Sequence, residues 1–205
     1  MITAIGIELS TDTETASVAV AGRPEGAWRA EVNLVYYGPD GGAVAAVTAA
    51  YADPGCCGTW CDPAQVAGLL GDLRSEGVWL HELGAVEVAA ASYVFKAAVR
   101  ARRVKTSGHE ALKAAMQYAM RRPLASAFAF ERRKVAADMA PLNAAAFAVF
   151  GLQVNEGGDS PGVFMIGAGG GEAALTARGR LSEQETADLV AAVYKKTRAG
   201  LRRPG

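Results

Sequence analysis

The stretch TAIGIELSTDTETASVAVA, residues 3–21, places two apolar runs on either side of a short polar segment. Residues 3–9 and 15–21 are rich in Ala, Ile and Val, which favour strands, and the STDTE sequence between them is typical of a turn. A third run, WRAEVNLVYY at 28–37, follows the turn sequence GRPEG. Connections this short join antiparallel neighbours. The sequence therefore predicts a three-stranded antiparallel meander.

After this meander the pattern changes to alternating helices and strands. Helices are expected at 41–53, 63–77 and 86–102, and strands at 56–61 and 78–83. Such alternation predicts parallel pairing with the first sheet. Further along we expect a helix at 109–122, a short strand at 126–133 and an apolar helix at 140–152. This is the element order of an α/β, ribonuclease-H-like fold, a mixed sheet with helices on both faces.

The chain divides into one predicted domain and a C-terminal extension. We expect residues 1–152 to form the ribonuclease-H-like domain, and residues 153–205 to form an extension that contains the connector-like sequence NEGGDSPG at 155–162. Ser182 is followed three positions later by Glu185, which is the pattern of a capping box. We therefore expect a helix near 182–199.

Composition limits the class of protein. A chain of 205 residues with 51% hydrophobic content is not disordered throughout. The start has no basic segment typical of a signal peptide, and the longest apolar run, 140–152, is too short to cross a bilayer. The three cysteines all lie in 56–61, which argues against a disulfide framework. We expect a cytoplasmic protein with no membrane partner.

Charge is distributed unevenly along the chain. Residues 1–99 hold four Lys and Arg against twelve Asp and Glu, a net of −8, whereas residues 100–205 hold seventeen against nine, a net of +8. One interpretation is that the first half gathers carboxylates around cations and the second half presents Arg and Lys to phosphates. The other is that the two halves neutralise each other across the surface.

Three acidic residues stand at informative places. Glu8 lies near the end of the first strand, Asp62 at the end of the fourth, and Asp138 just before the last apolar helix. The first and fourth strands are neighbours in a ribonuclease-H-like sheet, so we expect all three side chains at one edge. Converging carboxylates repel one another unless a cation neutralises them, and oxygen ligands suit Mg²⁺ or Mn²⁺. Two such ions about 4 Å apart can activate water and stabilise the leaving oxygen of a phosphodiester.

Each acid also has a simpler interpretation. Asp62 precedes Pro63 and fits a helix N-cap, and Asp138 fits an acid beside a helix N-terminus. Glu8 follows residues that look buried on both faces, where an unpaired carboxylate would be costly, so a ligand role is favoured. Asp12, in the first turn, is either a supplementary ligand or a turn-forming residue.

Four stretches occur in an order typical of one protein family. They are IGIELSTDTETASVAVAG, WCDPAQVAGLL, VEVAAASYVFKAAVRARRVKTSGHEALKAAMQYAMRR and ERRKVAADMAPLNAAAFAVFGL. The more specific features are a PL-x-A-A helix preceded by an Asp and an upstream G-x-x-x-L helix. Over about residues 5–152 the sequence resembles the C-terminal nuclease domain of phage terminase large subunits, which package DNA.

This resemblance implies an endonuclease that depends on two Mg²⁺ or Mn²⁺ ions and cleaves double-stranded, concatemeric DNA. The acids of the family match Glu8, Asp62 and Asp138, although the family usually has Asp at the first position. The extra methylene of Glu8 moves its carboxylate by more than about an ångström, which could weaken or retune a two-metal site. The implied partners are the terminase ATPase domain, the small terminase subunit and the portal, in the host cytoplasm of a phage or prophage protein.

Other functions stay open. The sequence holds no G-x-x-x-x-G-K-[ST] motif, so the ATP-hydrolysing part of a terminase is missing, and the chain is either an excised domain or a free-standing relative. Because of Glu8, it is alternatively a weakened nuclease that docks DNA or the portal. A transposase or junction resolvase is a further alternative on the same fold.

Basic clusters follow the acidic first half. The candidate contacts to the DNA backbone are Arg100, Arg102, Arg103, Lys105, Arg121, Arg122, Arg132, Arg133 and Lys134. Ordinary solvated helix ends are the alternative. We expect structural roles for His81 and His109, and core positions for the tryptophans, Trp28, Trp60 and Trp79.

Overall fold

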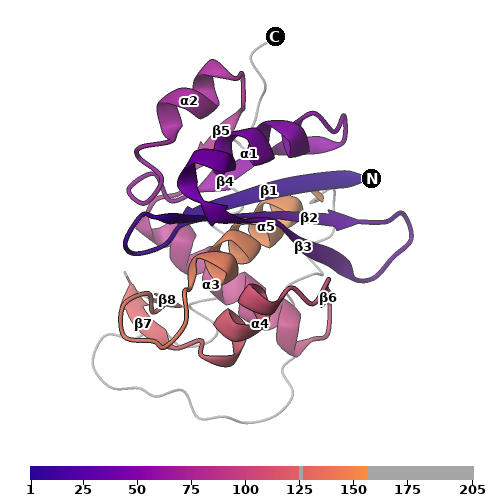
Figure 1. Cartoon of the computed structure of the whole chain (residues 1–205). Helices are drawn as coiled ribbons and strands as arrows, with labels where there is room; N and C mark the ends of the chain where they lie inside the picture. Colours follow the sequence, from indigo (N-terminus) through magenta and orange to yellow (C-terminus); the bar gives the residue numbers. More distant parts are fainter. Residues whose placement is uncertain (125–126, 157–205) are drawn as a thin grey trace.

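The computed structural model describes residues 1–124 and 127–156 (Figure 1). The first three strands are β1 (Ile2–Leu9), β2 (Thr15–Arg23) and β3 (Ala30–Pro39). β1 pairs with β2 and β2 with β3, both antiparallel, as the short turns predict. The register places Glu8 opposite Ser17, and Ser17 opposite Tyr37.

The middle of the chain completes the sheet. Its elements are η1 (Asp40–Gly42), α1 (Ala43–Tyr51), β4 (Cys56–Cys61), α2 (Leu70–Ser75), β5 (Leu80–Glu82), α3 (Ala85–Arg100) and β6 (Val104–Thr106). The strand order is β5-β4-β1-β2-β3-β6. β4 is parallel to β1 and β5 is parallel to β4, so the predicted parallel pairing is confirmed.

The remaining elements are α4 (Glu110–Gln117), β7 (Arg121–Leu124), β8 (Ala127–Phe130) and α5 (Ala140–Glu156). The prediction of a helix over 109–122 is wrong at its end, because residues 121–122 belong to β7. Pro123 disfavours a helical conformation in the residue before it. β8 begins one residue after the predicted start and pairs with β7 in a separate two-stranded sheet, not with the main sheet.

Two further sequence predictions are corrected. The helix expected over 63–77 is only α2, because residues 63–69 form a series of turns before it, with Gly68 and Gly71 lowering helix propensity at their boundary. β6 was not predicted, since its three residues are too few to show a period. It pairs in parallel with the start of β3.

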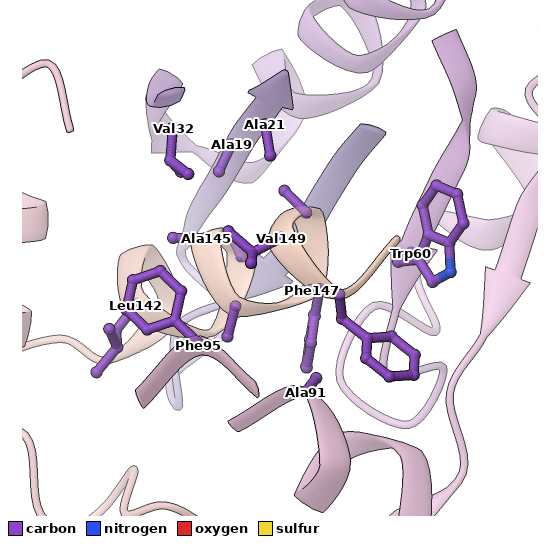
Figure 2. Close-up of a cluster of buried hydrophobic side chains, with 14 of the residues drawn as sticks. Ala19, Ala21, Val32, Trp60, Ala91, Phe95, Leu142, Ala145, Phe147 and Val149 are labelled. Atoms are coloured by element: carbon purple, nitrogen blue, oxygen red, sulfur yellow. The ribbon is translucent and has the colours of Figure 1, made fainter. Parts of the chain in front are cut away.

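Helices cover both faces of the sheet. In Figure 1, α1 and α2 lie on one side, and α5 lies on the other with α3 and α4 beyond it. α5 is apolar all round because it is enclosed between the sheet and α3. Figure 2 shows Ala145 and Val149 of α5 beside Ala19 and Val32 of the sheet. The predicted α/β, ribonuclease-H-like architecture is confirmed.

A glycine allows this helix to lie close to β1. A Cβ atom at Gly6 would stand 2.0 Å from the carbonyl oxygen of Ala144 and 2.7 Å from the amide nitrogen of Ala148. Because both are backbone atoms, neither can move aside by a change of rotamer. Gly6 therefore fixes how near α5 approaches the strand that carries Glu8.

α5 ends at Glu156, four residues beyond the predicted helix end, and the expected helix near 182–199 lies outside the described residues. Among the helices that the structure describes, none combines the length and apolar character needed to span a bilayer.

Candidate functional site

Glu8 projects from β1 toward α5. Side chains alternate along the strand, so Gly6 and Glu8 face α5 whereas Ile5 and Ile7 belong to the core beneath α1. The Glu8 side chain is completely buried. Burial raises its pKa from an ordinary value of 4.5 to about 8, against the opposing effect of Arg132.

Arg132 provides the cation next to Glu8. Its guanidinium forms an ion pair with Glu8 Oε1, and its Nη2 lies 3.4 Å from Oδ2 of Asp62. The Arg132 side chain is only 11% exposed. Its backbone is held by the Thr11 hydroxyl, which donates to the Arg132 carbonyl at 3.3 Å, and by Glu131, whose carboxylate accepts the Arg132 amide at 3.0 Å. A buried cation thus lies between the first two predicted acids.

Asp62 follows the last residue of β4. Its Oδ1 accepts the amide of Ala64 at 3.1 Å, which closes a turn, while its Oδ2 faces Arg132. The cap predicted for Asp62 therefore serves this turn and not α2, which begins eight residues later at Leu70. Asp62 also raises the pKa of Glu8, so the two carboxylates are close enough to interact.

Asp138 stands at the beginning of α5. Its Oδ1 accepts the amide of Ala140 at 2.9 Å, as expected of an acid at a helix N-terminus. Burial raises the pKa of Asp138, and the hydrogen bond from the Ala140 amide opposes this rise. The nearby Tyr37 lowers the same pKa as well. Asp138 contributes to the raised pKa of Glu8 as well. All three acids therefore lie at one edge of the sheet, near the ends of β1 and β4.

Asp12 closes the turn between β1 and β2. Its Oδ1 accepts the hydroxyl of Ser10 and the amide of Glu14, the latter at 3.1 Å. The Ser10 hydrogen bond is the main cause that lowers the pKa of Asp12. These contacts are those of a turn-forming residue, and a ligand role for Asp12 stays a prediction.

The oxygen atoms of the acids are of the kind that bind hard cations, but the Arg132 side chain separates Glu8 from Asp62. Within residues 1–124 and 127–156, no three His, Cys, Asp or Glu side chains stand close enough together to hold one metal ion. The donors are carboxylate oxygens, and Glu8 Oε2 is buried without a hydrogen bond from any described residue. Mg²⁺ and Mn²⁺ prefer such oxygens. The donor chemistry therefore suits a divalent cation, but in this structure the Arg132 guanidinium lies between the carboxyl groups of Glu8 and Asp62.

The predicted basic residues fall into two groups. Arg122, in β7, lowers the pKa of Glu8, and Arg133 and Lys134 follow Arg132 in the same loop. Arg121 precedes Arg122 and lies over the Phe128 ring, 5.6 Å from its centre. These five residues belong to the β7–β8 hairpin and the loop after it, near the acids.

The second basic group is Arg100, Arg102, Arg103 and Lys105. It lies at the opposite end of the sheet, where Ala30 at the start of β3 donates its amide to the Arg103 carbonyl at 2.9 Å. Lys105 pairs with Glu31 at 3.3 Å. Tyr37, which contacts Asp138, is seven residues further along β3, or about 23 Å at strand spacing. The structure does not bring this group together with the acids.

Of the three tryptophans predicted in the core, only Trp60 is fully buried, because Trp79 is partly exposed and contacts His81. Trp60 is buried and stacks on His81 at 4.3 Å, and burial lowers the pKa of His81 to about 4. His109 accepts the Ala111 amide at 3.2 Å and caps α4, so both histidines have structural contacts. Trp28 is 61% exposed, so its predicted core position is wrong.

Sequence reasoning missed two features of the site. The pairing of Arg132 with Glu8 and Asp62 depends on the path of the loop after β8, and no sequence spacing indicated it. Tyr37 had a usable signal, because the strand pattern places it in line with Ser17 and Glu8 across the sheet, two strands away from Glu8. Burial raises the pKa of Tyr37, and the nearby Asp138 raises it further.

Strand order, flanking helices and an acidic edge between β1 and β4 together define an α/β protein with a ribonuclease-H-like fold. The structure is similar to the crystal structure of the HK97 bacteriophage large terminase, with a TM-score of 0.59 and 13% sequence identity. The alignment covers 73% of this chain and 39% of that protein. No family model matches the sequence, and no curated protein matches it. The predicted resemblance to phage large terminases is thus confirmed for the fold.

Proposed function

We propose that the chain is a metal-dependent endonuclease domain that cleaves double-stranded DNA, related to the nuclease domain of phage large terminases. The observation that carries this proposal is that Glu8, Asp62 and Asp138 lie at one edge of the sheet, with Arg132 in contact with the first two. Burial raises the pKa of Glu8, and Asp62 and Asp138 raise it further. Carboxylates gathered at one buried edge oppose folding, and such perturbed groups cluster at functional sites. The fold similarity to a phage terminase supports the same function.

The proposed roles follow from how each side chain is held. Glu8, Asp62 and Asp138 would hold two Mg²⁺ or Mn²⁺ ions, which when bound activate water and stabilise the leaving oxygen. Asp62 and Asp138 each have one oxygen fixed by a backbone amide, which leaves the other for the site. Tyr37 lies close enough to Asp138 to affect its pKa.

Substrate and partners follow from the terminase resemblance. The substrate would be concatemeric DNA, bound through its phosphates by the basic residues nearest the acids: Arg121, Arg122, Arg133 and Lys134. The partners would be a terminase ATPase domain, a small terminase subunit and the portal, in the host cytoplasm. The sequence has no phosphate-loop motif, so the proposal does not include ATP hydrolysis.

Plasmid cleavage tests the proposal. With Mn²⁺ we expect nicked and linear products, and with EDTA intact plasmid. Asp62→Asn and Asp138→Asn keep a carbonyl oxygen for the Ala64 and Ala140 amides, so the fold should survive while cutting falls by about 100-fold or more. Asp72→Asn, an exposed acid in α2, removes the same charge outside the site and should cut normally. Intact plasmid with folded wild-type protein, or full cutting by both site variants, would overturn the proposal.

Arg132 favours a second candidate function. If its guanidinium permanently replaces a metal ion at Glu8 and Asp62, the domain is a weakened nuclease that docks DNA or the portal. This candidate predicts DNA binding that EDTA leaves unchanged and a melting temperature that Mn²⁺ does not raise. A rise in melting temperature with Mn²⁺ that Asp62→Asn removes would exclude it.

A further inference from the structure

The Arg132 guanidinium lies between the carboxyl groups of Glu8 and Asp62. It contacts both carboxylates, and it is almost buried with them: the three side chains are 11%, 0% and 19% exposed. Each carboxylate comes from the end of a different strand, and Arg132 comes from the loop after a hairpin outside the main sheet. The fold thus delivers a positive charge from a separate element into the acidic edge.

We propose that Arg132 is an exchangeable counter-ion. It pairs with the Glu8 and Asp62 carboxyl groups when no divalent cation is bound, leaves them when cations bind, and then contacts a DNA phosphate. This inference rests on the proposed function, because it assumes that the same acids hold cations.

Charge balance favours the exchange. Glu8, Asp62 and Asp138 carry at most three negative charges, and Arg122 and Arg132 bring two positive charges to the same place. Two divalent ions added to this set would give an excess of three positive charges in a largely buried site. Buried charges without partners are strongly unfavourable, and a guanidinium beside a divalent ion is repelled. Removing Arg132 from the carboxylates lowers this excess and also frees their oxygens.

The backbone of Arg132 can stay in place during the exchange. Thr11 holds its carbonyl, and Glu131 accepts the amides of both Arg132 and Arg133. Only the long, flexible side chain needs to turn, so the released guanidinium stays within a side-chain length of the acids. The planar guanidinium binds phosphate with paired hydrogen bonds, which gives Arg132 a new partner when DNA is present.

This arrangement couples cation binding to DNA binding. A cation that displaces Arg132 makes a phosphate contact available, and DNA that takes up Arg132 makes the carboxylates available to cations. By linkage each ligand raises the affinity for the other to the same extent. Without Arg132, cations should bind more tightly but should no longer strengthen DNA binding by this route.

Ca²⁺ is a suitable probe, because it binds oxygen ligands and its effect can be measured without cleavage. We would titrate Ca²⁺ into the folded wild-type chain, Arg132→Ala and Arg132→Lys, following binding by calorimetry and melting temperature. Arg29→Ala is the matched control, since Arg29 stacks on Trp28 at the far end of the sheet. We expect Arg132→Ala to melt lower than wild type without Ca²⁺, to regain stability with Ca²⁺, and to bind Ca²⁺ about tenfold more tightly. Arg29→Ala should bind it as wild type does.

DNA binding gives the second readout, by fluorescence anisotropy with a short duplex in Ca²⁺ or EDTA. Wild type should gain affinity several-fold in Ca²⁺, and Arg132→Ala should lose most of this gain. Arg132→Lys keeps the charge without the planar group and should fall between them. If Arg132→Ala does not fold, Arg132→Gln takes its place in both assays.

The outcomes separate the inference from the proposed function. Equal or weaker Ca²⁺ affinity after removal of Arg132, or an unchanged gain in DNA affinity, would overturn the exchange while leaving a cation site. Absence of Ca²⁺ binding and of Mn²⁺ binding to every folded variant would overturn the cation site, and the exchange with it.

Discussion

Replacing Glu8 with Gln tests how the acidic edge is built. Glu8 is fully buried, and burial raises its pKa from 4.5 to about 8. The folded chain therefore keeps a proton on Glu8 over a pH range in which the unfolded chain has lost it. The contribution of Glu8 to the unfolding free energy is fully present below pH 4.5 and is lost as the pH rises toward 8. Glu8→Gln carries no titratable group and does not lose stability in this way.

The size of the effect follows from the pKa shift. Each pH unit between the two pKa values costs the wild type about 1.4 kcal/mol of unfolding free energy relative to Glu8→Gln. Over the whole interval the difference approaches about 5 kcal/mol, which is a large part of the stability of an ordinary domain. Glu8→Gln should therefore be increasingly more stable than wild type as the pH rises.

Urea denaturation in EDTA at pH 5, 6, 7 and 8 measures this difference. Asp12→Asn is the control, because Asp12 is exposed and its pKa is lowered, so both states have lost its proton over this range. The difference between Asp12→Asn and wild type should stay constant. Parallel curves for Glu8→Gln and wild type would refute the conclusion that Glu8 is held as a desolvated acid.

Three other predictions concern the core, His81 and the basic groups. Gly6→Ala places a Cβ atom 2.0 Å from a backbone oxygen of α5, so it should lower the unfolding free energy measured in urea by more than about 3 kcal/mol. Gly71→Ala is the control, because its Cβ atom would enter open space, and a Gly6→Ala variant as stable as wild type would contradict the packing. Burial lowers the pKa of His81 from 6.5 to about 4, so the folded chain should lose up to about 3 kcal/mol of unfolding free energy as the pH drops from 6.5 to 4. His81→Phe should abolish this loss, and acid denaturation curves with the same slope for wild type and His81→Phe would contradict the prediction. Arg133→Ala, near the acids, should lower the DNA affinity measured by fluorescence anisotropy more than Arg102→Ala at the opposite end of the sheet. Equal losses of affinity would contradict the division of the basic residues into two groups.

The main sheet and α5 were accessible from the sequence because their signals are strong. The apolar runs at 3–9 and 15–21 and the turn between them define β1 and β2, and the uncharged, mainly apolar run at 140–152 indicates an enclosed helix. Short elements gave no such signal. β6 has three residues, and β7, with sequence RRPL, reads as the end of a basic helix until its pairing with β8 is known.

The site was accessible in part for a similar reason. Strand order alone places Glu8 and Asp62 at neighbouring strand ends, and the start of α5 places Asp138 near them. The direction of β6 decides where Arg100 to Lys105 lie, and without that strand the sequence could not separate them from the acids. Trp28 was misplaced because it precedes the first residue of β3 and lies in the turn. The position of Arg132 depends on tertiary contacts with Thr11 and Glu8.

Anomalous diffraction from crystals of this chain grown with Mn²⁺ tests the central claim most directly, because it locates the ion itself. We expect Mn²⁺ bound by carboxylate oxygens of Glu8, Asp62 and Asp138, with the Arg132 guanidinium no longer paired with Glu8. Saturating Mn²⁺ that leaves these carboxylates without an ion, and Arg132 still between Glu8 and Asp62, would contradict the claim that this edge of the sheet is a metal-dependent nuclease site.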